Sequence, residues 1–174
     1  MSAKVLITGG TGFVGANVVR HLLARGDEVV CAVRASSPGL CLDGLDVQRT
    51  ELDLFDSKSL TVQLKGFDGI YHCAGTFDPG PGGEKKMHAI HVDATRALCD
   101  ASLKAGVRRL VLCSSSVTVG FGPRSRPGNE DTPIADLDGV YGSAGPLRAY
   151  HDTKLASEEL ARSYVDKGLE TVIV

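Results

Sequence analysis

The chain has 174 residues, of which 43% are hydrophobic, and its 19 basic and 21 acidic residues give a net charge of −2. This length predicts a single domain with a sizeable buried core. The near-neutral charge, without a basic stripe, argues against a nucleic-acid partner held through phosphates. No apolar run reaches the length of a signal peptide or a membrane span, so we expect a cytoplasmic protein with no membrane partner.

The cysteines and histidines do not form a recognisable metal or disulfide pattern. Five cysteines without a C-x-x-C pair predict free thiols, and Cys31, Cys73 and Cys113 fall in expected strands as small buried side chains. His88 and His91 lie three residues apart on an expected helix, where they could offer two metal ligands. Because no third ligand is close in the sequence, we predict no metal site.

Apolar and amphipathic segments alternate along the whole chain. Strands are expected near Lys4–Thr8, Glu28–Val33, Val47–Asp53, Gly69–Ala74, Arg109–Ser114 and Glu170–Val174. Helices are expected near Gly12–Arg25, Ser57–Lys65, Glu84–Ala105 and Arg148–Lys167. This alternation predicts an α/β fold, a Rossmann-type doubly wound parallel sheet with helices on both faces. The apolar runs Val29–Val33 and Leu110–Cys113 are typical of strands covered on both sides.

The segment Thr8–Gly15 (TGGTGFVG) joins the first expected strand to the first helix. Gly9 allows a tight turn, Gly12 allows the backbone to approach a diphosphate, and Gly15 allows close packing of helix and strand. The amide groups and the positive end of the helix would then face the anion. The alternative is a glycine-rich turn without a ligand. We expect dinucleotide contacts from residues of this turn: Gly9, Thr11, Gly12, Phe13, Val14 and Gly15.

Two glycine- and proline-rich segments are longer than ordinary connections. Residues 76–83 and 117–147 both follow the carboxyl ends of expected strands, where open α/β sheets bind ligands. We expect them to wall a substrate pocket. The chain also stops within the apolar run Glu170–Val174, which suggests a fragment or a shortened copy of a larger protein.

Tyr150 is the only tyrosine with a lysine four positions later, Lys154. Residues spaced by four lie on one face of a helix, so a phenol and an ammonium group can share a site. The nearby cation would favour the phenolate, which suits a general acid in carbonyl reduction or a general base in alcohol oxidation. The alternative is a surface tyrosine beside a solvated lysine.

In combination these motifs resemble the short-chain dehydrogenase/reductase superfamily. The resemblance is to its extended branch of NAD(P)-dependent epimerases, dehydratases and dihydroflavonol-4-reductase-like enzymes. The matching segments span the chain in the family's order: TGGTGFVG at 8–15, Asp53-Leu54, His72-Cys73-Ala74-Gly75, the serines 114–116, and YHDTK at 150–154.

The resemblance implies roles for particular residues. Ser116, Tyr150 and Lys154 would form the catalytic set, in which Ser116 orients the substrate oxygen and Lys154 also holds a ribose hydroxyl. Asp53 would accept a bond from the adenine amino group, with Leu54 beside it. Further cofactor contacts are implied for the small residues Ala74 and Gly75. Ser114 and Ser115 are instead expected to complete the strand end.

The end of the second strand bears on cofactor preference. NAD-specific sites usually carry an acidic residue there, whereas this chain has Val33-Arg34-Ala35-Ser36-Ser37. Arg34 could clamp a 2′-phosphate, aided by Ser36 or Ser37, so we expect NADP rather than NAD. The alternative is an exposed arginine in a loop.

Two departures from the family pattern stand out. His91 and Ala94 replace an asparagine and a glycine that the pattern commonly holds, which bears on local packing more than on chemistry. Residues 1–174 also correspond only to the NAD(P)-binding domain, and the C-terminal substrate domain of extended members is absent from this chain.

We therefore predict an NADP-dependent oxidoreductase that reduces a small ketone or aldehyde, with its truncated form of uncertain activity. The alternatives are a nucleotide-sugar epimerase or dehydratase, and a truncated, non-catalytic dinucleotide-binding module. Family resemblance also suggests a homodimer through the two long helices, although the same residues could instead pack on the sheet. The candidate contacts are Ala97, Leu98, Ala101, Leu160, Ala161 and Tyr164.

Overall fold

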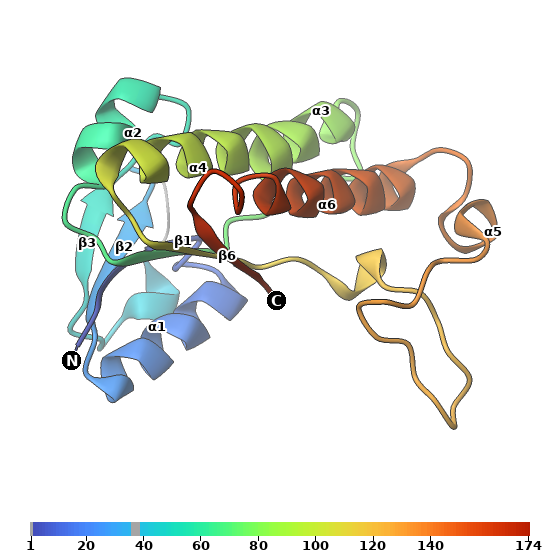
Figure 1. Cartoon of the computed structure of the whole chain (residues 1–174), viewed down its shortest axis with the longest axis horizontal. Coiled ribbons are helices and arrows are strands. Elements are labelled where there is room, and N and C mark those ends of the chain that lie inside the picture. The colour runs from blue at the N-terminus through green and yellow to red at the C-terminus, as the bar shows by residue number, and fades with distance from the viewer. Residues whose placement is uncertain (1, 36–38) are drawn as a thin grey trace.

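Six parallel strands form one sheet in the order β3-β2-β1-β4-β5-β6 (Figure 1). The computed structural model describes residues 2–35 and 39–174. This strand order reverses direction between β1 and β4, which is the arrangement of a Rossmann sheet, and ligands bind such sheets at the reversal. The strands are β1 (Lys4–Thr8), β2 (Glu28–Val33), β3 (Gln48–Glu51), β4 (Gly69–His72), β5 (Arg109–Leu112) and β6 (Glu170–Ile173).

Helices cover both faces of the sheet, as predicted, but unequally. The helix α1 (Phe13–Arg25) packs with a short 3₁₀ turn, η1 (Leu40–Leu42), on one face. The other face carries a layer of helices, which lies above the sheet in Figure 1. These are α2 (Ser57–Gln63), α3 (Gly83–His88), α4 (Ala94–Ala105) and α6 (Pro146–Arg162).

The predicted elements are confirmed, with differences at their ends. The expected helix Glu84–Ala105 is one continuous run in which α3 and α4 are joined by a π-helical turn, η2 (Ala89–Asp93). The last helix begins two residues early, because Pro146 suits a first helical position, and its regular part ends at Arg162 rather than Lys167. Three short elements were not predicted: η1, η3 (Ser116–Thr118) and α5 (Leu137–Tyr141).

The core has one cluster on each face of the sheet. Alternate strand residues supply them: Leu6, Ile70 and Leu110 face the layer of α2, α4 and α6, and Ile7 and Cys31 face α1. Five of the six residues named above as dimer contacts belong to the first cluster or pack against it, and the sixth, Ala161, is fully buried. They therefore pack inside the monomer, because this side of α4 and α6 lies on the sheet. A homodimer through these two helices would use their other faces, and it stays a prediction.

One half of the α1 side of the sheet is less covered than the apolar pattern predicts. Tyr71, Val111 and Val172 occupy matching positions on β4, β5 and β6. Val111 is only half-buried and Val172 is 41% exposed. Within residues 2–35 and 39–174, α1 contacts β1 and β2, and no helix lies over β5 and β6 on this side. The expectation that Leu110–Cys113 is covered on both faces is therefore wrong for this strand.

The long segment between β5 and α6 extends away from the sheet (Figure 1). It contains η3 and α5, and its chain returns on itself where the Gly120 amide donates to the Thr132 carbonyl over 2.8 Å. A Cβ atom on Gly128 would lie 1.9 Å from the Gly120 carbonyl oxygen, so this close return requires glycine. The glycines of this segment thus specify a defined loop. Across the described residues, no helix combines the length and apolar character needed to cross a membrane.

Candidate functional site

The glycine turn after β1 is shaped by backbone contacts. Gly9 has a φ of 71°, and a Cβ atom there would lie 2.6 Å from the main chain of Cys73 and Ala74. A Cβ atom on Gly15 would lie 2.3 Å from the Gly9 carbonyl oxygen. The turn and the start of α1 therefore pack backbone to backbone, as expected for these two glycines.

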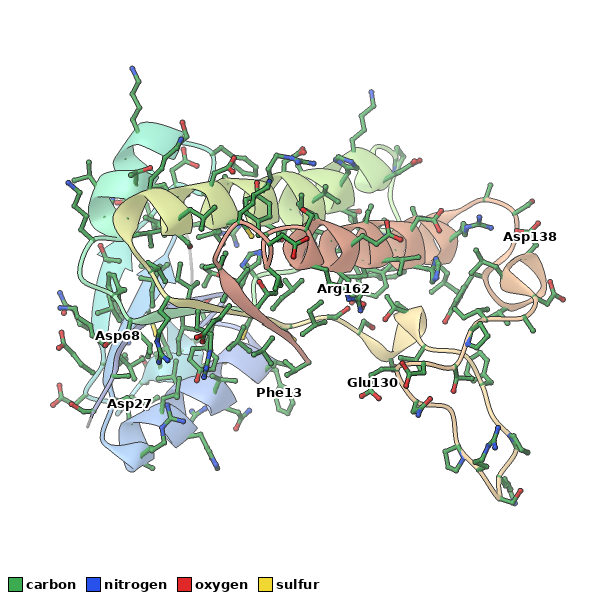
Figure 2. All side chains as sticks on the ribbon, viewed as in Figure 1. Phe13, Asp27, Asp68, Glu130, Asp138 and Arg162 are labelled. Atoms are coloured by element: carbon green, nitrogen blue, oxygen red, sulfur yellow. The ribbon has the colours of Figure 1, made fainter. Side chains whose placement is uncertain are left out.

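The first turn of α1 is open toward the carboxyl edge of the sheet. Gly12 begins the helix without a side chain that could cap it, and the first turn carries no acidic residue. The amides of such a turn have no partners within the helix and attract anions. Phe13 projects from the start of α1 (Figure 2) and is 84% exposed, Val14 is 50% exposed, and Thr11 is half-buried. The cradle can accept a diphosphate through main-chain groups.

The other predicted cofactor residues lie at the ends of neighbouring strands. Arg34 follows β2 and is exposed, whereas Ser36 and Ser37 lie outside the described residues. Asp53 follows β3, is exposed, and accepts a bond from the Phe55 amide over 2.9 Å. Leu54 packs against the core beneath it. The parallel register brings all these strand ends to one edge of the sheet.

Tyr150 and Lys154 lie on α6 above the ends of β4 and β5. Lys154 is 5% exposed, and its ammonium group donates to the Cys113 carbonyl over 2.7 Å. A Cβ atom on Gly75 would lie 4.0 Å from Lys154 Nζ, so Gly75 and the ammonium group are close neighbours. Burial lowers the pKa of Lys154, and the nearby Cys113 and Glu158 offset part of that effect. The lysine is thus fixed in the site.

Tyr150 is half-buried between two rings. Its ring meets Phe77 edge-on with centroids 5.6 Å apart, and His91 with centroids 5.5 Å apart. The Tyr150 ring therefore lies between Phe77 and His91 on the surface of α6. The side chain is therefore held in place, unlike a solvated surface tyrosine.

The three serines after β5 have different surroundings. The Ser114 hydroxyl donates to the Glu158 carboxylate, and the Ser115 hydroxyl accepts from the Val117 amide over 3.4 Å. Ser116 begins η3 and is exposed. The first two hydroxyls hold the strand end, as expected, and the third is open to a ligand.

His91 replaces the expected asparagine and braces two segments. Its Nε2 accepts from the Thr76 amide over 3.2 Å, and its Nδ1 lies 2.9 Å from Thr153 Oγ1. The Thr153 hydroxyl donates to the Ala149 carbonyl, so Nδ1 carries the proton. Burial lowers the pKa of His91 to about 4, helped by the Lys154 charge. The neutral ring ties the loop after β4 to α6.

A second buried histidine holds the turn after β1. His72 Nδ1 lies 2.6 Å from Thr8 Oγ1, and the same hydroxyl accepts from the Ala74 amide over 3.3 Å. Burial, with smaller contributions from Lys154 and His91, lowers the pKa of His72 to about 3. The ends of β1 and β4 are thereby joined directly beneath the glycine turn.

Because His72 and His91 are buried in their neutral form, we predict that the protein loses stability in mild acid. Their pKa values are lower in the folded chain than the usual value near 6.5, so the unfolded chain binds more protons below that pH. The free energy of unfolding should fall as the pH drops from 6.5 toward 4, by up to about 1.4 kcal/mol per pH unit for each histidine. Urea unfolding at several pH values measures this slope.

The control compares a buried with an exposed histidine. His91→Gln keeps a donor and an acceptor and should remove about half of the slope. His21→Gln, at an exposed position of α1, should leave it unchanged. An unchanged slope in His91→Gln would contradict the assignment.

Glu158 is a site residue that the sequence analysis missed. Its carboxylate is buried and accepts from Ser114 and from Thr118, the latter over 2.8 Å. Arg162, one turn further along α6 and labelled in Figure 2, donates to the other carboxylate oxygen of Glu158, and this bond is 2.8 Å long. Glu158 therefore joins α6 to the loop that carries Ser116. Glu158 lies four residues after Lys154, as Lys154 lies four residues after Tyr150, so all three fall on one face of the helix. This repeated spacing could have identified Glu158 from the sequence.

In the described part of the chain, no three His, Cys, Asp or Glu side chains lie close enough together to hold a metal ion. Of the two histidines considered as metal ligands, His88 lies beside Asp93 and His91 makes the contacts given above. The two side chains therefore contact different residues and do not form a common site.

A parallel sheet of this order with a backbone-lined turn after β1 defines a Rossmann-type fold, the class in which this turn usually holds a dinucleotide. The comparison with protein families then identifies the family. Residues 5–174 match the NAD dependent epimerase/dehydratase family. The chain belongs to this family.

Curated relatives and solved structures support the assignment. The chain is 36% identical to Sterol demethylase protein B of Methylococcus capsulatus and 34% identical to a putative dihydroflavonol 4-reductase of Synechocystis. These matches cover 97% and 100% of the chain, which spans about half the length of either relative (49% and 48%).

Among solved structures, a short-chain dehydrogenase/reductase superfamily protein from Agrobacterium tumefaciens with bound NAD has a TM-score of 0.76 and 32% identity. The match covers 98% of this chain and 48% of that one. A UDP-glucose 4-epimerase from Thermus thermophilus in complex with NAD has a TM-score of 0.77 and 25% identity, over 98% of this chain and 53% of that one.

Proposed function

We propose that this chain is the dinucleotide-binding part of an NADP-dependent oxidoreductase that reduces a small-molecule ketone or aldehyde to an alcohol. The observation that carries the proposal is the fixed Tyr150–Lys154 pair at the carboxyl edge of the sheet. Tyr150 is held between Phe77 and His91, and Lys154 is buried against the Cys113 carbonyl. A held phenol one helical turn before a buried ammonium group supports acid–base chemistry better than a structural role.

The residues of the cradle fit a nicotinamide dinucleotide. The main chain from Gly9 to Gly15 would take the diphosphate, and Asp53 would take the adenine end. When bound, NADPH supplies a hydride to the carbonyl carbon. Tyr150 gives its proton to the carbonyl oxygen, Lys154 stabilises the phenolate that remains, and Ser116 orients that oxygen through its exposed hydroxyl.

Arg34 carries the preference for NADP. It is exposed at the end of β2, where its guanidinium group can form paired hydrogen bonds with a 2′-phosphate. The two solved relatives described above hold NAD, so the prediction distinguishes this chain from them. Arg34→Ala should weaken NADPH binding roughly tenfold, the loss of one charge-assisted contact, and change NADH binding little. Titration of both dinucleotides by calorimetry measures the difference.

Arg20→Ala provides the control, because Arg20 lies on α1, donates to the Cys41 carbonyl, and should affect neither titration. Equal losses for NADPH and NADH in Arg34→Ala would refute the phosphate clamp.

The proposed reaction is tested by NADPH consumption with a panel of carbonyl substrates. Several relatives of this chain are named as 3-beta-hydroxysteroid dehydrogenases or sterol-4-alpha-carboxylate 3-dehydrogenases, so the panel should include 3-ketosteroids beside simple ketones and aldehydes. Consumption of NADPH with a ketone supports the proposal. Binding of NADPH with no turnover, by this chain and by any longer protein that contains it, would favour a non-catalytic module.

The second candidate is a nucleotide-sugar epimerase or dehydratase. The epimerase structure from Thermus thermophilus, similar over 98% of this chain, favours it. Such an enzyme would interconvert or dehydrate a nucleotide sugar without net consumption of dinucleotide. Adding nucleotide sugars to the panel and following product formation separates the two reactions.

A further inference from the structure

Cys73 and Cys113 form a pair of thiols beneath the candidate site. The β4–β5 ladder pairs His72 with Leu112, and it continues with a 3.0 Å bond from the Cys113 amide to the His72 carbonyl. The two cysteines are therefore direct neighbours on adjacent strands, one residue beyond the paired ends. Each cysteine is one residue beyond the pair His72–Leu112, so both side chains lie on the same side of the sheet. The Cys113 thiol also donates to the Ser114 carbonyl over 3.9 Å.

The backbone separation at this point suits a disulfide. Neighbouring strands lie about 4.8 Å apart, within the Cα separation of about 4.4–6.8 Å that disulfides span. Both residues are free cysteines and both are half-buried, so a small reagent can reach them. The remaining cysteines differ: Cys31 and Cys99 are buried, and Cys41 is exposed on η1.

The surroundings make the two sulfur atoms unequal. The neighbouring Cys73 thiol and the ammonium group of Lys154, which donates to the Cys113 carbonyl over 2.7 Å, hold the pKa of Cys113 below its usual range. The neighbouring Cys113 thiol and burial raise the pKa of Cys73. The Lys154 ammonium group is bound at Cys113 itself, so Cys113 is the nucleophile of the pair, because the thiolate is the reactive form.

We infer that Cys73 and Cys113 are an oxidation site that a hydroperoxide converts to a disulfide between β4 and β5. The Cys113 thiolate attacks one peroxide oxygen, the O–O bond breaks, and hydroxide leaves to give a sulfenic acid. The Cys73 sulfur then attacks the Cys113 sulfur, its proton goes to the departing oxygen, and water leaves. Two thiols and one hydrogen peroxide give one disulfide and two waters.

The test is peptide mapping of the whole chain after brief treatment with hydrogen peroxide, alkylation and tryptic digestion without reduction. Trypsin places Cys73 in the peptide 66–85 and Cys113 in the peptide 110–124, and each holds no other cysteine. We expect these two peptides joined, with a mass two hydrogens below their sum, and released by dithiothreitol. The linkage should form at least about tenfold faster than oxidation of Cys41, which lies in the peptide 35–49.

Two single variants test the order of events. In Cys73→Ser the Cys113 sulfenic acid should accumulate and be trapped by dimedone, whereas in Cys113→Ser the Cys73 thiol should remain open to alkylation. Cys41→Ser is the matched control and should form the linked peptides as the parent does. The readout needs no dinucleotide or substrate, so it is independent of the proposed function.

The inference is overturned if both peptides are recovered singly alkylated when Cys41 is already oxidised. Pairing of Cys73 or Cys113 with another cysteine, or dimedone labelling of Cys73 in Cys113→Ser, would overturn it as well.

Discussion

Tyr150→Phe is expected to lower kcat by about 10²–10⁴-fold, the usual contribution of a positioned acid. The substitution removes only the hydroxyl group, and the ring contacts with Phe77 and His91 remain possible. Because the ring and α6 stay in place, the affinity for NADPH should change by less than about threefold. Steady-state kinetics with a ketone substrate, together with a dinucleotide titration, measure both quantities.

Tyr141→Phe is the matched control for this experiment. Its hydroxyl donates to the Val117 carbonyl over 2.9 Å, and its ring stacks on His151 rather than on the residues around Tyr150. We expect a small loss of stability and little change in kcat. Full activity of Tyr150→Phe, with Tyr141→Phe equally active, would remove the phenol from the proposed mechanism.

Gly15→Ala is expected to destabilise the fold by at least about 2 kcal/mol, because the new methyl group has no space. Its Cβ atom would lie 2.3 Å from the Gly9 carbonyl oxygen and 2.9 Å from the Gly10 Cα atom. Both are main-chain atoms, so neither a rotamer change nor a flexible side chain can relieve the contact. Urea unfolding measures the loss, and NADPH binding should fall with it because the turn must open.

Gly12→Ala provides a comparison within the same turn. Its added methyl group would meet only the Gly9 carbonyl oxygen, at 3.3 Å, and its φ of −87° is open to any residue. We expect stability within about 1 kcal/mol of the parent and a clear loss of NADPH binding, since the methyl group faces the expected diphosphate. Unchanged NADPH affinity in Gly12→Ala would contradict the placement of the diphosphate.

The fold could be predicted from the sequence because its signals are local. Apolar strand runs alternate with amphipathic helices, and the structure has each of the ten predicted elements within a few residues. The glycines of the first turn were also predictable, because only glycine tolerates the φ of Gly9 and the backbone contact at Gly15.

Other parts of the site depend on contacts between distant segments. The bond between His72 and Thr8 joins residues 64 positions apart, and that between Ser114 and Glu158 joins residues 44 apart. Periodicity within one helix or strand carries no information on such pairs. The packing of the six candidate dimer residues within the monomer was equally hidden, since an apolar stripe on a helix has the same spacing whether it meets the sheet or a second chain.

The order of strands also separates the residue proposed to select the coenzyme from the residues proposed to transfer the proton. Arg34 follows β2, whereas Lys154 is anchored on the residue after β5, and both β1 and β4 lie between these strands. Under the proposed function, changes that retune the choice between phosphorylated and unphosphorylated coenzyme would therefore be made at one end without disturbing proton transfer at the other. An engineer could alter the loop after β2 and retain the chemistry of α6.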